Sequence, residues 1–307
     1  MEERGFVFAP YDDLSDPILF PLDEAELYKE EFKEIEINSD ATLPFNDEGK
    51  QHHIQLVEKA IEEIKSTDLR KIVVSRAEVL EASEFQVEQI FRRLLSKYQN
   101  AFVYCWYHPE VGLWMGASPE TLCKVNSGRL VSIALAGTQP HIDGQQVNWG
   151  TKEIEEQQMV ADYIIEAIQG KVDNVSIGEV HTVRAGDLLH LKTRIEGDIN
   201  PKSTLRDIVS ELHPTPAVCG LPKELAQSFL ANQEGYDRKF YTGFLGELNY
   251  DVGGDKDASH FFVNLRCMEY DHDKIFIYVG GGITADSIAE KEWEETLNKT
   301  LTIKSVL

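Results

Sequence analysis

The sequence predicts an α+β protein in which large, mostly antiparallel β-sheets pack together with helices outside. Strand-like runs outnumber helical ones, and hairpin-like turns such as Asn126-Ser127-Gly128 join neighbouring strands. No regular alternation of strand and helix indicates a doubly wound fold. Since no repeat or low-complexity linker divides the 307 residues, we expect one large domain. Residues 1–50 would supply N-terminal strands and an acidic surface excursion, and residues 51–307 the main body.

Composition excludes several classes of protein. An apolar content of 42% is typical of a globular chain. The formal net charge of −23 argues against nucleic acid or an anionic membrane as a partner. No apolar run approaches the roughly 18 residues of a membrane span, and the charged N-terminus lacks the apolar core of a signal peptide. The four cysteines form no Cys-x-x-Cys pair and are expected to be buried hydrophobes. We therefore expect a cytoplasmic protein.

The first half of the chain contains two expected helices and a basic strand. Short strands are expected at residues 5–11 and 17–21. The apolar spacing predicts helices over residues 51–66 and 87–96. Between them, residues 70–80 form a strand that begins on Arg70 and Lys71. Lys71 is either a solvated strand-end lysine or a functional base.

A glutamate follows the next predicted strand, residues 101–115. Pro119 cannot donate to a sheet ladder and biases Ser118 toward extended geometry, so Glu120 is expected at a strand break. A hairpin through residues 126–128 should bring Glu120 near residues 135–138, whose small side chains let a ligand approach the backbone. An ordinary hairpin with an exposed glutamate would show the same pattern.

A second glutamate lies on the helix expected over residues 150–169. At 100° per residue, Glu156 shares a face with Val160 and Ile164, and a carboxylate on an apolar stripe needs a cation, a metal or the mouth of a cleft. Strands over residues 175–182 and 188–197 follow, with His190 either a core residue or a functional one. Helices are expected at 205–212 and 223–231, separated by a proline-rich rigid loop.

The last third has strands over residues 240–250, 259–270 and 274–279. Arg266 would lie inside the second of these, where it needs a counter-ion. The third leads into three glycines, Gly280 to Gly282, whose amides are able to face an anion. The final helix begins with a Ser287-x-x-Glu290 capping-box pattern. One of its faces carries Glu292, Glu295 and Lys299, which form either a solvated face or a Mg²⁺ site.

Taken together and in this order, these motifs resemble the chorismate-utilising enzymes, and among them the isochorismate synthases of menaquinone or siderophore pathways. The resemblance runs from about residue 50 to the C-terminus. The chain is shorter than typical members, so some N-terminal strands of the family are expected to be missing. The motifs are Arg70-Lys71-Ile-Val-Val-Ser-Arg76, Gly116-Ala-Ser-Pro-Glu120, Leu135-Ala-Gly-Thr138, Leu189-His190-Leu191, His213-Pro-Thr-Pro-Ala217, Val263-Asn-Leu-Arg266, Gly280-Gly-Gly-Ile283 and Glu292-Trp-Glu-Glu295.

The resemblance implies a Mg²⁺-dependent attack of water at C2 of chorismate with loss of the C4 hydroxyl. Lys71 corresponds to the general base that activates water, and Glu120 to the general acid that protonates the departing hydroxyl. Glu156 and Glu295 correspond to Mg²⁺ ligands, with Glu292 beside them. The departure of residues 153–156 from the frequent Asp-Arg-x-Glu pattern removes an arginine near the metal.

The resemblance also implies a set of substrate contacts. Arg266 and the amides of Gly280, Gly281 and Gly282 would clamp the enolpyruvyl carboxylate. The family favours a monomer with no obligate amidotransferase partner. The remaining residues implied to line the pocket are Gly137, Thr138, His190, Ala217, Tyr241 and Lys299.

The sequence distinguishes some related chorismate-utilising activities better than others. Ala136 stands where aminodeoxychorismate synthases carry lysine, which argues against that activity. Lys71 favours water over the ammonia used by anthranilate synthase component I. Salicylate synthase, which adds pyruvate elimination, shares the base and the acid and stays an alternative. A silent paralogue is disfavoured because the four proposed catalytic and metal positions are all retained.

Overall fold

The computed structural model describes residues 3–12, 15–36, 43–142, 144, 147–185, 188–250 and 258–307. The chain forms two compact units whose segments interleave along the sequence. The nine-stranded unit comprises Met1–Glu26, Glu120–Ala217 and Thr242–Val263. The six-stranded unit comprises Leu27–Pro119, Val218–Tyr241 and Asn264–Leu307.

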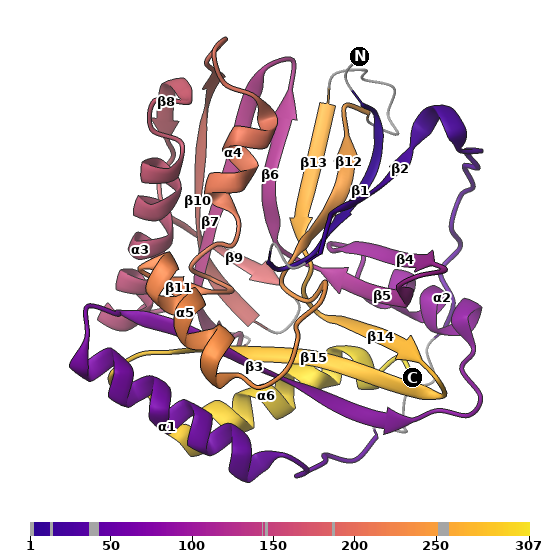
Figure 1. Cartoon of the computed structure of the whole chain (residues 1–307), viewed down its shortest axis with the longest axis vertical. Helices are drawn as coiled ribbons and strands as arrows, with labels where there is room; N and C mark the ends of the chain where they lie inside the picture. The colour runs from indigo at the N-terminus through magenta and orange to yellow at the C-terminus, as the bar shows by residue number, and fades with distance from the viewer. Residues whose placement is uncertain are drawn as a thin grey trace. The chain divides into compact units, whose positions relative to one another are not determined.

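The nine-stranded unit is built on one sheet with the strand order β2-β1-β12-β13-β6-β7-β10-β8, to which β9 adds by pairing with β10 (Figure 1). Its described pairings are all antiparallel. The strands are β1 (Gly5–Ala9), β2 (Ile18–Pro21), β6 (Thr121–Asn126), β7 (Arg129–Pro140), β8 (Val172–Ile177), β9 (His181–Ala185), β10 (Leu188–Ile199), β12 (Phe244–Leu248) and β13 (Ala258–Val263); the helices are η1 (Leu22–Glu24), α3 (Thr151–Ala167) and α4 (Leu205–Leu212).

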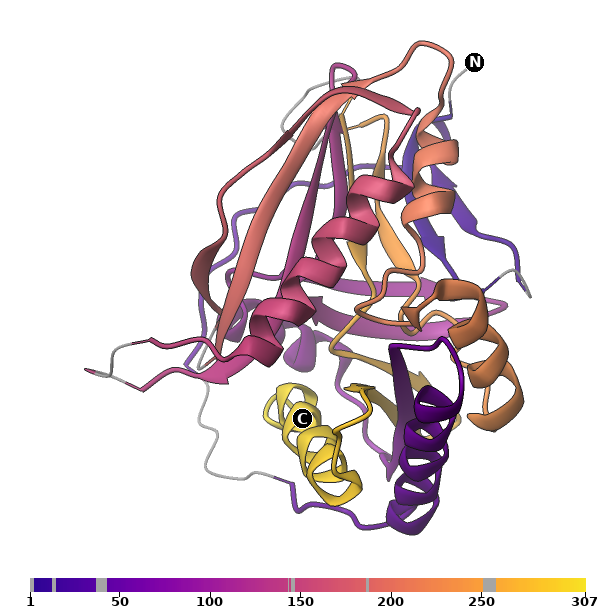
Figure 2. The same ribbon diagram turned by 90° about the vertical axis from the view of Figure 1, so that its left-hand side faces the viewer.

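Helix α3 covers part of this sheet. Figure 2 shows it lying along β7 and β10. Its buried positions Gln157, Val160, Ala161 and Ile164 recur at helical spacing and form the face turned to the strands. Helix α4 begins with a capping box in which Thr204 and the side chain three residues on bond each other's backbone amides.

The six-stranded unit contains a sheet of order β11-β3-β15-β14-β5-β4, again antiparallel throughout its described pairings. Helices α1 and α6 lie beside each other and pack against β3 and β15 (Figure 1). The strands are β3 (Lys71–Glu81), β4 (Phe102–His108), β5 (Gly112–Ser118), β11 (Gly220–Leu221), β14 (Cys267–Asp271) and β15 (Lys274–Ile283); the helices are α1 (Lys50–Ser66), α2 (Val87–Lys97), α5 (Lys223–Gln233) and α6 (Ala289–Lys304).

The α+β class with antiparallel sheets, predicted from turn signals and strand content, is confirmed. The expected helices all form, with ends within two residues of the predicted ones except for the last helix. None of the helices in the described part of the chain has both the length and the apolar character to span a bilayer. The division of the domain near residue 50 stays a prediction.

Three predicted strands were wrong because each covers parts of two strands. Residues 175–182 include the end of β8 and the start of β9. Residues 101–115 form most of the β4–β5 hairpin, whose turn includes Gly112 at φ 98°. Residues 259–270 are interrupted after Val263, so that β13 lies in the nine-stranded sheet and β14 in the six-stranded sheet. Arg266 therefore stands in the connection between these strands, at φ 50°, and not inside a strand.

The expectations for the C-terminal region also need correction. Gly280 to Gly282 do not follow a strand: they form the last part of β15 and pair with β3. Ser287 does not cap α6, because the helix begins after Ile288 and the Ser287 hydroxyl accepts the amide of Thr284. The buried face of α6 carries polar as well as apolar side chains; its buried residues are Glu292, Trp293, Thr296, Thr300, Ile303 and Lys304.

Candidate active site

Several of the predicted site residues stand where the chain passes from one unit to the other. These passages occur between Pro119 and Glu120, between Ala217 and Val218, and between Tyr241 and Thr242. Glu120 and Ala217 belong to the nine-stranded unit, and Tyr241 to the six-stranded unit.

Lys71 is the first residue of β3, and its side chain is 8% exposed. It is held between two strands, since it pairs with Leu221 of β11 while the adjacent Ile72 pairs with Ile283 of β15. Its side chain lies over Gly282, where a β-carbon would be 2.7 Å from Lys71 Cε and 3.3 Å from Nζ. The absence of a side chain at Gly282 thus leaves the space that the lysine occupies. The solvated strand-end interpretation of Lys71 is wrong.

Gly280 is the second point of close approach on the same face. A β-carbon there would be 3.1 Å from the Tyr241 hydroxyl and 3.0 Å from Ser75 Cβ. Burial raises the pKa of Tyr241 above its ordinary value, so its hydroxyl keeps its proton near neutral pH. The Tyr241 ring stacks on Tyr278, with 5.4 Å between centroids. Tyr241 therefore offers a fixed hydrogen-bond donor beside the glycines.

The glycine amides point in alternating directions. The amides of Val73 and Ser75 bond Cys219 and Glu234, away from β15. Along an antiparallel strand, successive residues direct their backbone N–H and C=O groups to opposite sides. The backbone groups of Val74 therefore face β15, and those of its partner Gly281 face β3. The amides of Gly280 and Gly282 then point away from β3. β14 pairs with β15 only up to Ile277, so these amides lie beyond its last paired residue.

Helix α6 brings two carboxylates and a lysine to the other face of β15. Glu292 Oε2 lies 3.5 Å, and Glu295 Oε1 3.8 Å, from the position that a β-carbon on Gly281 would occupy. Lys299 pairs with Glu295, and its Nζ donates to the Gly280 carbonyl at 2.7 Å. The face of α6 predicted from sequence is thus a real cluster. Among the described residues, no three His, Cys, Asp or Glu side chains come close enough together to hold a metal ion.

Arg266 is positioned through its backbone. Its carbonyl accepts the amide of Ala117 at 3.1 Å, and a β-carbon on Gly116 would lie 3.0 Å from the same oxygen. The glycine of the Gly116-to-Glu120 motif thereby lets β5 approach Arg266 closely. Two motifs that are far apart in the sequence are adjacent in the six-stranded unit.

In the nine-stranded unit, Gly137, Thr138 and His190 come together at a β-bulge. His190 pairs with Thr138 and Leu191 with Ala136, so Gly137 is the extra residue, at φ 72°. His190 Nδ1 lies 3.2 Å from both the Thr138 hydroxyl and the Gly137 carbonyl oxygen. The alternative of His190 as a core residue is not supported, because its side chain is only partly buried and makes polar contacts.

Glu156 lies on α3, one turn beyond the point where the helix meets this bulge. A β-carbon on Gly137 would be 3.0 Å from the Glu153 carbonyl oxygen. The polar residue on the buried stripe of α3 is Gln157, which donates to Thr193 at 2.6 Å. Glu156 is half-buried and borders that stripe, so the prediction that placed it on the stripe was one position off.

Glu120 and Ala217 follow strand or loop breaks, as their neighbours predict. Glu120 stands between β5 and β6, and its carbonyl accepts the amide of Val263 at 3.0 Å. The predicted strand break at Glu120 is confirmed. Ala217 lies within the proline-rich loop, in which His213 lies 3.2 Å from the Tyr11 carbonyl oxygen.

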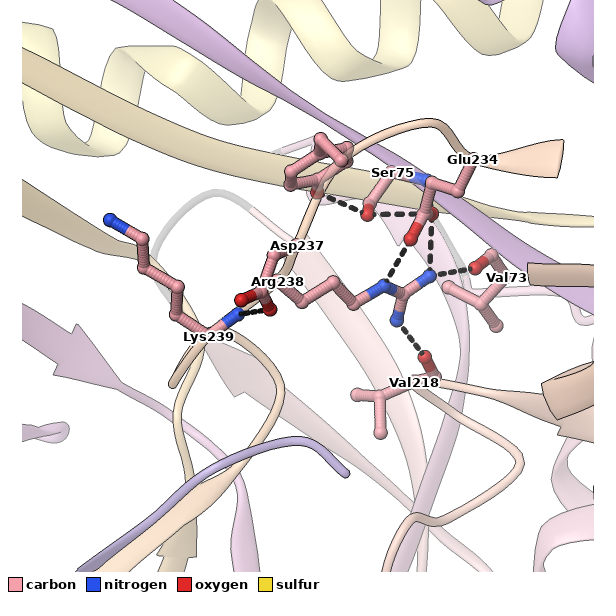
Figure 3. A network of polar contacts seen from close by, with 8 residues as sticks. Val73, Ser75, Val218, Glu234, Asp237, Arg238 and Lys239 are labelled. Carbon is pink, nitrogen blue, oxygen red and sulfur yellow. Dashed lines mark hydrogen bonds and ion pairs between the residues drawn. The ribbon is translucent and has the colours of Figure 1, made fainter. Parts of the chain in front are cut away.

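Sequence reasoning missed three buried residues of the six-stranded unit. Asn264 donates to the Phe240 carbonyl and accepts from the Tyr104 hydroxyl, which fixes the chain just before Tyr241. Glu234 and Arg238 form a buried ion pair next to β3 (Figure 3). The available signal was the i, i+4 spacing of opposite charges just after a helix, which is usually a surface pattern.

A family model described as chorismate binding enzyme matches residues 18–307. The chain belongs to the chorismate-binding enzymes. Among curated members of this family, the vibriobactin-specific isochorismate synthase of Vibrio cholerae is 29% identical over 274 residues, covering 86% of this chain and 68% of the relative. Isochorismate synthase DhbC of Bacillus subtilis is 30% identical over 265 residues, covering 80% and 65%. Isochorismate synthase MenF of Escherichia coli is 29% identical, covering 82% of this chain and 59% of its own.

Solved structures of chorismate-binding enzymes share the fold. A Bacillus anthracis structure assigned to 2,3-dihydroxybenzoate-specific isochorismate synthase DhbC superposes with a TM-score of 0.81 at 27% identity, covering 99% of this chain and 84% of the other. Anthranilate synthase component I from Streptococcus pneumoniae, at 24% identity and a TM-score of 0.73, covers 85% and 60% and shows the likeness of fold alone. The resemblance drawn from the sequence motifs is confirmed. The chain spans about three fifths to two thirds of the length of these curated relatives.

Proposed function

We propose that this chain is an isochorismate synthase, an isomerase that adds water at C2 of chorismate while the C4 hydroxyl leaves. The observation that carries the proposal is the placement of Lys71, which is buried and lies over Gly282. Burial disfavours the charged ammonium form of an amine. A lysine can act as a general base only when it is available in the neutral form.

We assign the role of general base on water to Lys71 and that of general acid to Glu120. Hydroxide is a poor leaving group, so the C4 oxygen must receive a proton as its bond to carbon breaks. The proton that water loses to Lys71 and the proton that Glu120 gives keep the reaction balanced: one water enters and one leaves. The same two groups exchange roles in the reverse direction, which makes the conversion reversible.

Two carboxylates on α6 offer oxygen ligands of the kind that a hard cation such as Mg²⁺ takes. Oxygens of Glu292 and Glu295 approach the same point beside Gly281, which a side chain at that position would fill. Carboxylate oxygens are the ligands Mg²⁺ prefers. We assign the ion to Glu295 with Glu292 beside it, and the resemblance adds Glu156 as a further ligand. When bound, Mg²⁺ would neutralise a carboxylate of the substrate.

The other substrate carboxylate needs donors, and the six-stranded unit supplies them. The amides of Gly280 and Gly282 point past the end of β14, and Tyr241 presents its hydroxyl beside Gly280. We propose that these groups and Arg266 bind the enolpyruvyl carboxylate, and that Lys299 orients it. Gly137, Thr138, His190 and Ala217 are proposed to contact the ring. Cytoplasmic location, a monomeric state and independence from an amidotransferase stay predictions.

The test is to incubate the purified protein with chorismate and Mg²⁺, without ammonia, and to separate the products by chromatography. We expect a mixture of chorismate and isochorismate, lost on adding EDTA. Lys71→Ala and Glu120→Gln should each lower turnover by about 10²- to 10⁴-fold. Lys304→Met is the control, because Lys304 is also buried but lies with Glu78 in the core of the same unit.

Other products would change the proposal in defined ways. Salicylate with pyruvate would move the activity to salicylate synthase. Turnover only with ammonia, giving an aminated product, would show an anthranilate-type subunit and contradict the role of Lys71. Unchanged turnover in Lys71→Ala would show that another group is the base.

A further inference from the structure

Strand β3 is paired along one edge for only part of its length. On that edge lies β11, which has just two residues and pairs with Lys71 and Ile72. Beyond them the amide of Val73 still finds a backbone acceptor, the carbonyl of Cys219, at 2.8 Å. The Val73 carbonyl and the Ser75 amide point to the same edge, where no further residues of β11 are available. Buried backbone groups left without partners would be costly.

A buried ion pair takes the place of the missing strand. Arg238 Nη2 donates to the Val73 carbonyl at 2.7 Å, and Glu234 Oε1 accepts the Ser75 amide at 2.7 Å (Figure 3). The two side chains are joined by hydrogen bonds of 2.6 and 2.7 Å and are 3% and 4% exposed. Together they continue the hydrogen bonding of β3 where β11 ends.

The same pair reaches the segments on either side. Arg238 Nη1 donates to the Val218 carbonyl at 2.8 Å, in the segment that leads into β11. The Arg238 carbonyl accepts the amide of Tyr241 at 2.8 Å. The Ser75 hydroxyl donates to Glu234 and also contacts the Tyr236 hydroxyl at 2.5 Å. The side chains of the ion pair are therefore bonded to β3 and to the approach to β11, and Arg238 itself belongs to the loop that carries Tyr241.

We propose that Arg238 and Glu234 are positioning residues of the reaction, which hold the strand of Lys71 and the loop of Tyr241 in fixed relation. The inference rests on the proposed function of Lys71. Both ends of this arrangement meet the glycines of β15, Lys71 at Gly282 and Tyr241 at Gly280. A shift of β3 against β11 would move the base while leaving its chemistry intact.

The geometry requires a guanidinium. Arg238 uses three nitrogens to serve Glu234 and two backbone carbonyls in different directions. A lysine supplies the charge but offers its donors from a single nitrogen and lacks the rigid fork. Arg238→Lys is therefore the discriminating variant, since it keeps the ion pair possible and removes the cross-connection.

The experiment compares Arg238→Lys with the control Lys304→Met. The control removes a buried cation that pairs with Glu78, a residue of β3. Turnover and KM of both variants and the wild type are measured with chorismate and Mg²⁺ at one common temperature, which is about 20 °C below the lowest of their Tm values. For Arg238→Lys we expect kcat to fall roughly 10- to 100-fold, because displacements of about 1 Å have that effect, with KM changed less than about 3-fold. Faster hydrogen exchange at the Ser75 amide should accompany the loss. Lys304→Met should keep kcat within about 2-fold, whatever its Tm.

Several outcomes would overturn the inference. Wild-type kcat in Arg238→Lys, or equal losses in both variants in proportion to their lost stability, would show a structural role only. Loss of kcat with unchanged exchange at Ser75 would show that Arg238 acts by another route. Absence of turnover in the wild type would instead defeat the proposed function itself. The two failures are therefore distinguishable.

Discussion

Strand β3 has two buried ion clusters, one at its edge and one on a face, and they are built differently. Arg238 and Glu234 lie at the edge of the strand and satisfy three backbone groups, two on β3 and one in the segment that leads into β11. On the face covered by α1 and α6, Glu78 pairs with Lys304 and lies 3.6 Å from the Arg76 guanidinium. Arg76 also lies over the Trp293 ring at 4.2 Å and donates to Thr296.

The difference is in hydrogen-bond completeness. Neither terminal nitrogen of Arg76 has a hydrogen-bond partner among the described residues, and the same is true of both ring nitrogens of His53 nearby. The charges at the strand edge serve three backbone groups, whereas those of the helix–sheet interface serve one in the described part of the chain, the Pro44 carbonyl to which Lys304 donates at 2.9 Å. The first cluster should therefore be indispensable and the second replaceable. The following predictions test this contrast.

The largest effect is expected when the edge pair is replaced by apolar residues. Glu234→Leu with Arg238→Met removes both charges but leaves the Val73 and Val218 carbonyls and the Ser75 amide without partners. Each buried unpaired group costs about 1–3 kcal/mol, so the free energy of unfolding should fall by at least about 3 kcal/mol. Urea denaturation monitored by tryptophan fluorescence measures it. A loss below about 1 kcal/mol would contradict the account of the edge.

The second effect is a loss of stability in acid that depends on His53. Burial, followed by the charges of Arg76 and His52, lowers the pKa of His53 from 6.5 to about 4. The unfolded chain takes up the proton below pH 6.5 and the folded chain resists it. The free energy of unfolding is therefore unaffected above pH 6.5 and falls by about 3 kcal/mol between pH 6.5 and 4.

The variant His53→Phe isolates this contribution. The ring is of similar size and, at 2% exposure, occupies the same buried place. We expect the difference in unfolding free energy between His53→Phe and the wild type to grow in favour of the variant as pH is lowered. A difference that stays constant from pH 7 to pH 4 would show that His53 does not resist protonation.

A smaller effect is expected on activity from two glycine variants on opposite faces of β15. Gly282→Ala places a β-carbon 2.7 Å from Lys71 Cε and should displace the lysine. Turnover should fall by at least about 10-fold, as expected for a misplaced base.

Gly281→Ala is the matched comparison. Its β-carbon would be in ordinary contact distance of Glu292 and Glu295, so the fold should tolerate it. For Gly281→Ala we expect half-maximal activity to need a higher Mg²⁺ concentration. The decline of its turnover at low pH should differ little from that of the wild type. Should the two alanines have the same effect on Mg²⁺ dependence, the assignment of the two faces to base and metal would be incorrect.

The smallest effect is expected in the interface cluster. Arg76→Met, Glu78→Leu and Lys304→Met together replace three buried charges by side chains of similar volume. Such replacements are often neutral or stabilising, so the free energy of unfolding should change by less than about 1 kcal/mol or rise. Thermal unfolding beside the edge-pair variant gives the comparison directly, and equal destabilisation of both would remove the distinction between the clusters.

The sequence predicted the elements that depend on local chemistry. Helical spacing located α1, α2 and α4, and Pro119 located the break at Glu120. It did not reveal that residues 259–270 leave one sheet and enter another, because the apolar residues on both sides of Arg266 suit a strand and the interruption appears only in the tertiary pairing. The motif residues were found through their family pattern, and their spatial roles were not.

Positions defined by contacts across the fold were the ones missed. The three glycines were expected to follow a strand, whereas they are strand residues whose missing side chains leave room for Lys71, Tyr241 and the α6 carboxylates. Arg238 and Glu234 were not singled out, because their spacing does not show that β11 stops after two residues. Burial of a charge is decided by neighbours that are distant in sequence.

The interleaved course of the chain has a consequence for the order in which the protein can fold during its synthesis. In the six-stranded sheet, β15 lies between β3 and β14, and Ile72 pairs with Ile283. A nascent chain in which residues 274–283 have not yet been synthesised can form neither the β3–β15 nor the β14–β15 pairing. We expect ribosome-bound chains arrested before residue 274 to remain sensitive to protease within residues 71–81. Chains that are complete and held on the ribosome by an added C-terminal linker should resist the protease. Late closure of this kind makes the middle of the sheet the last part to become native.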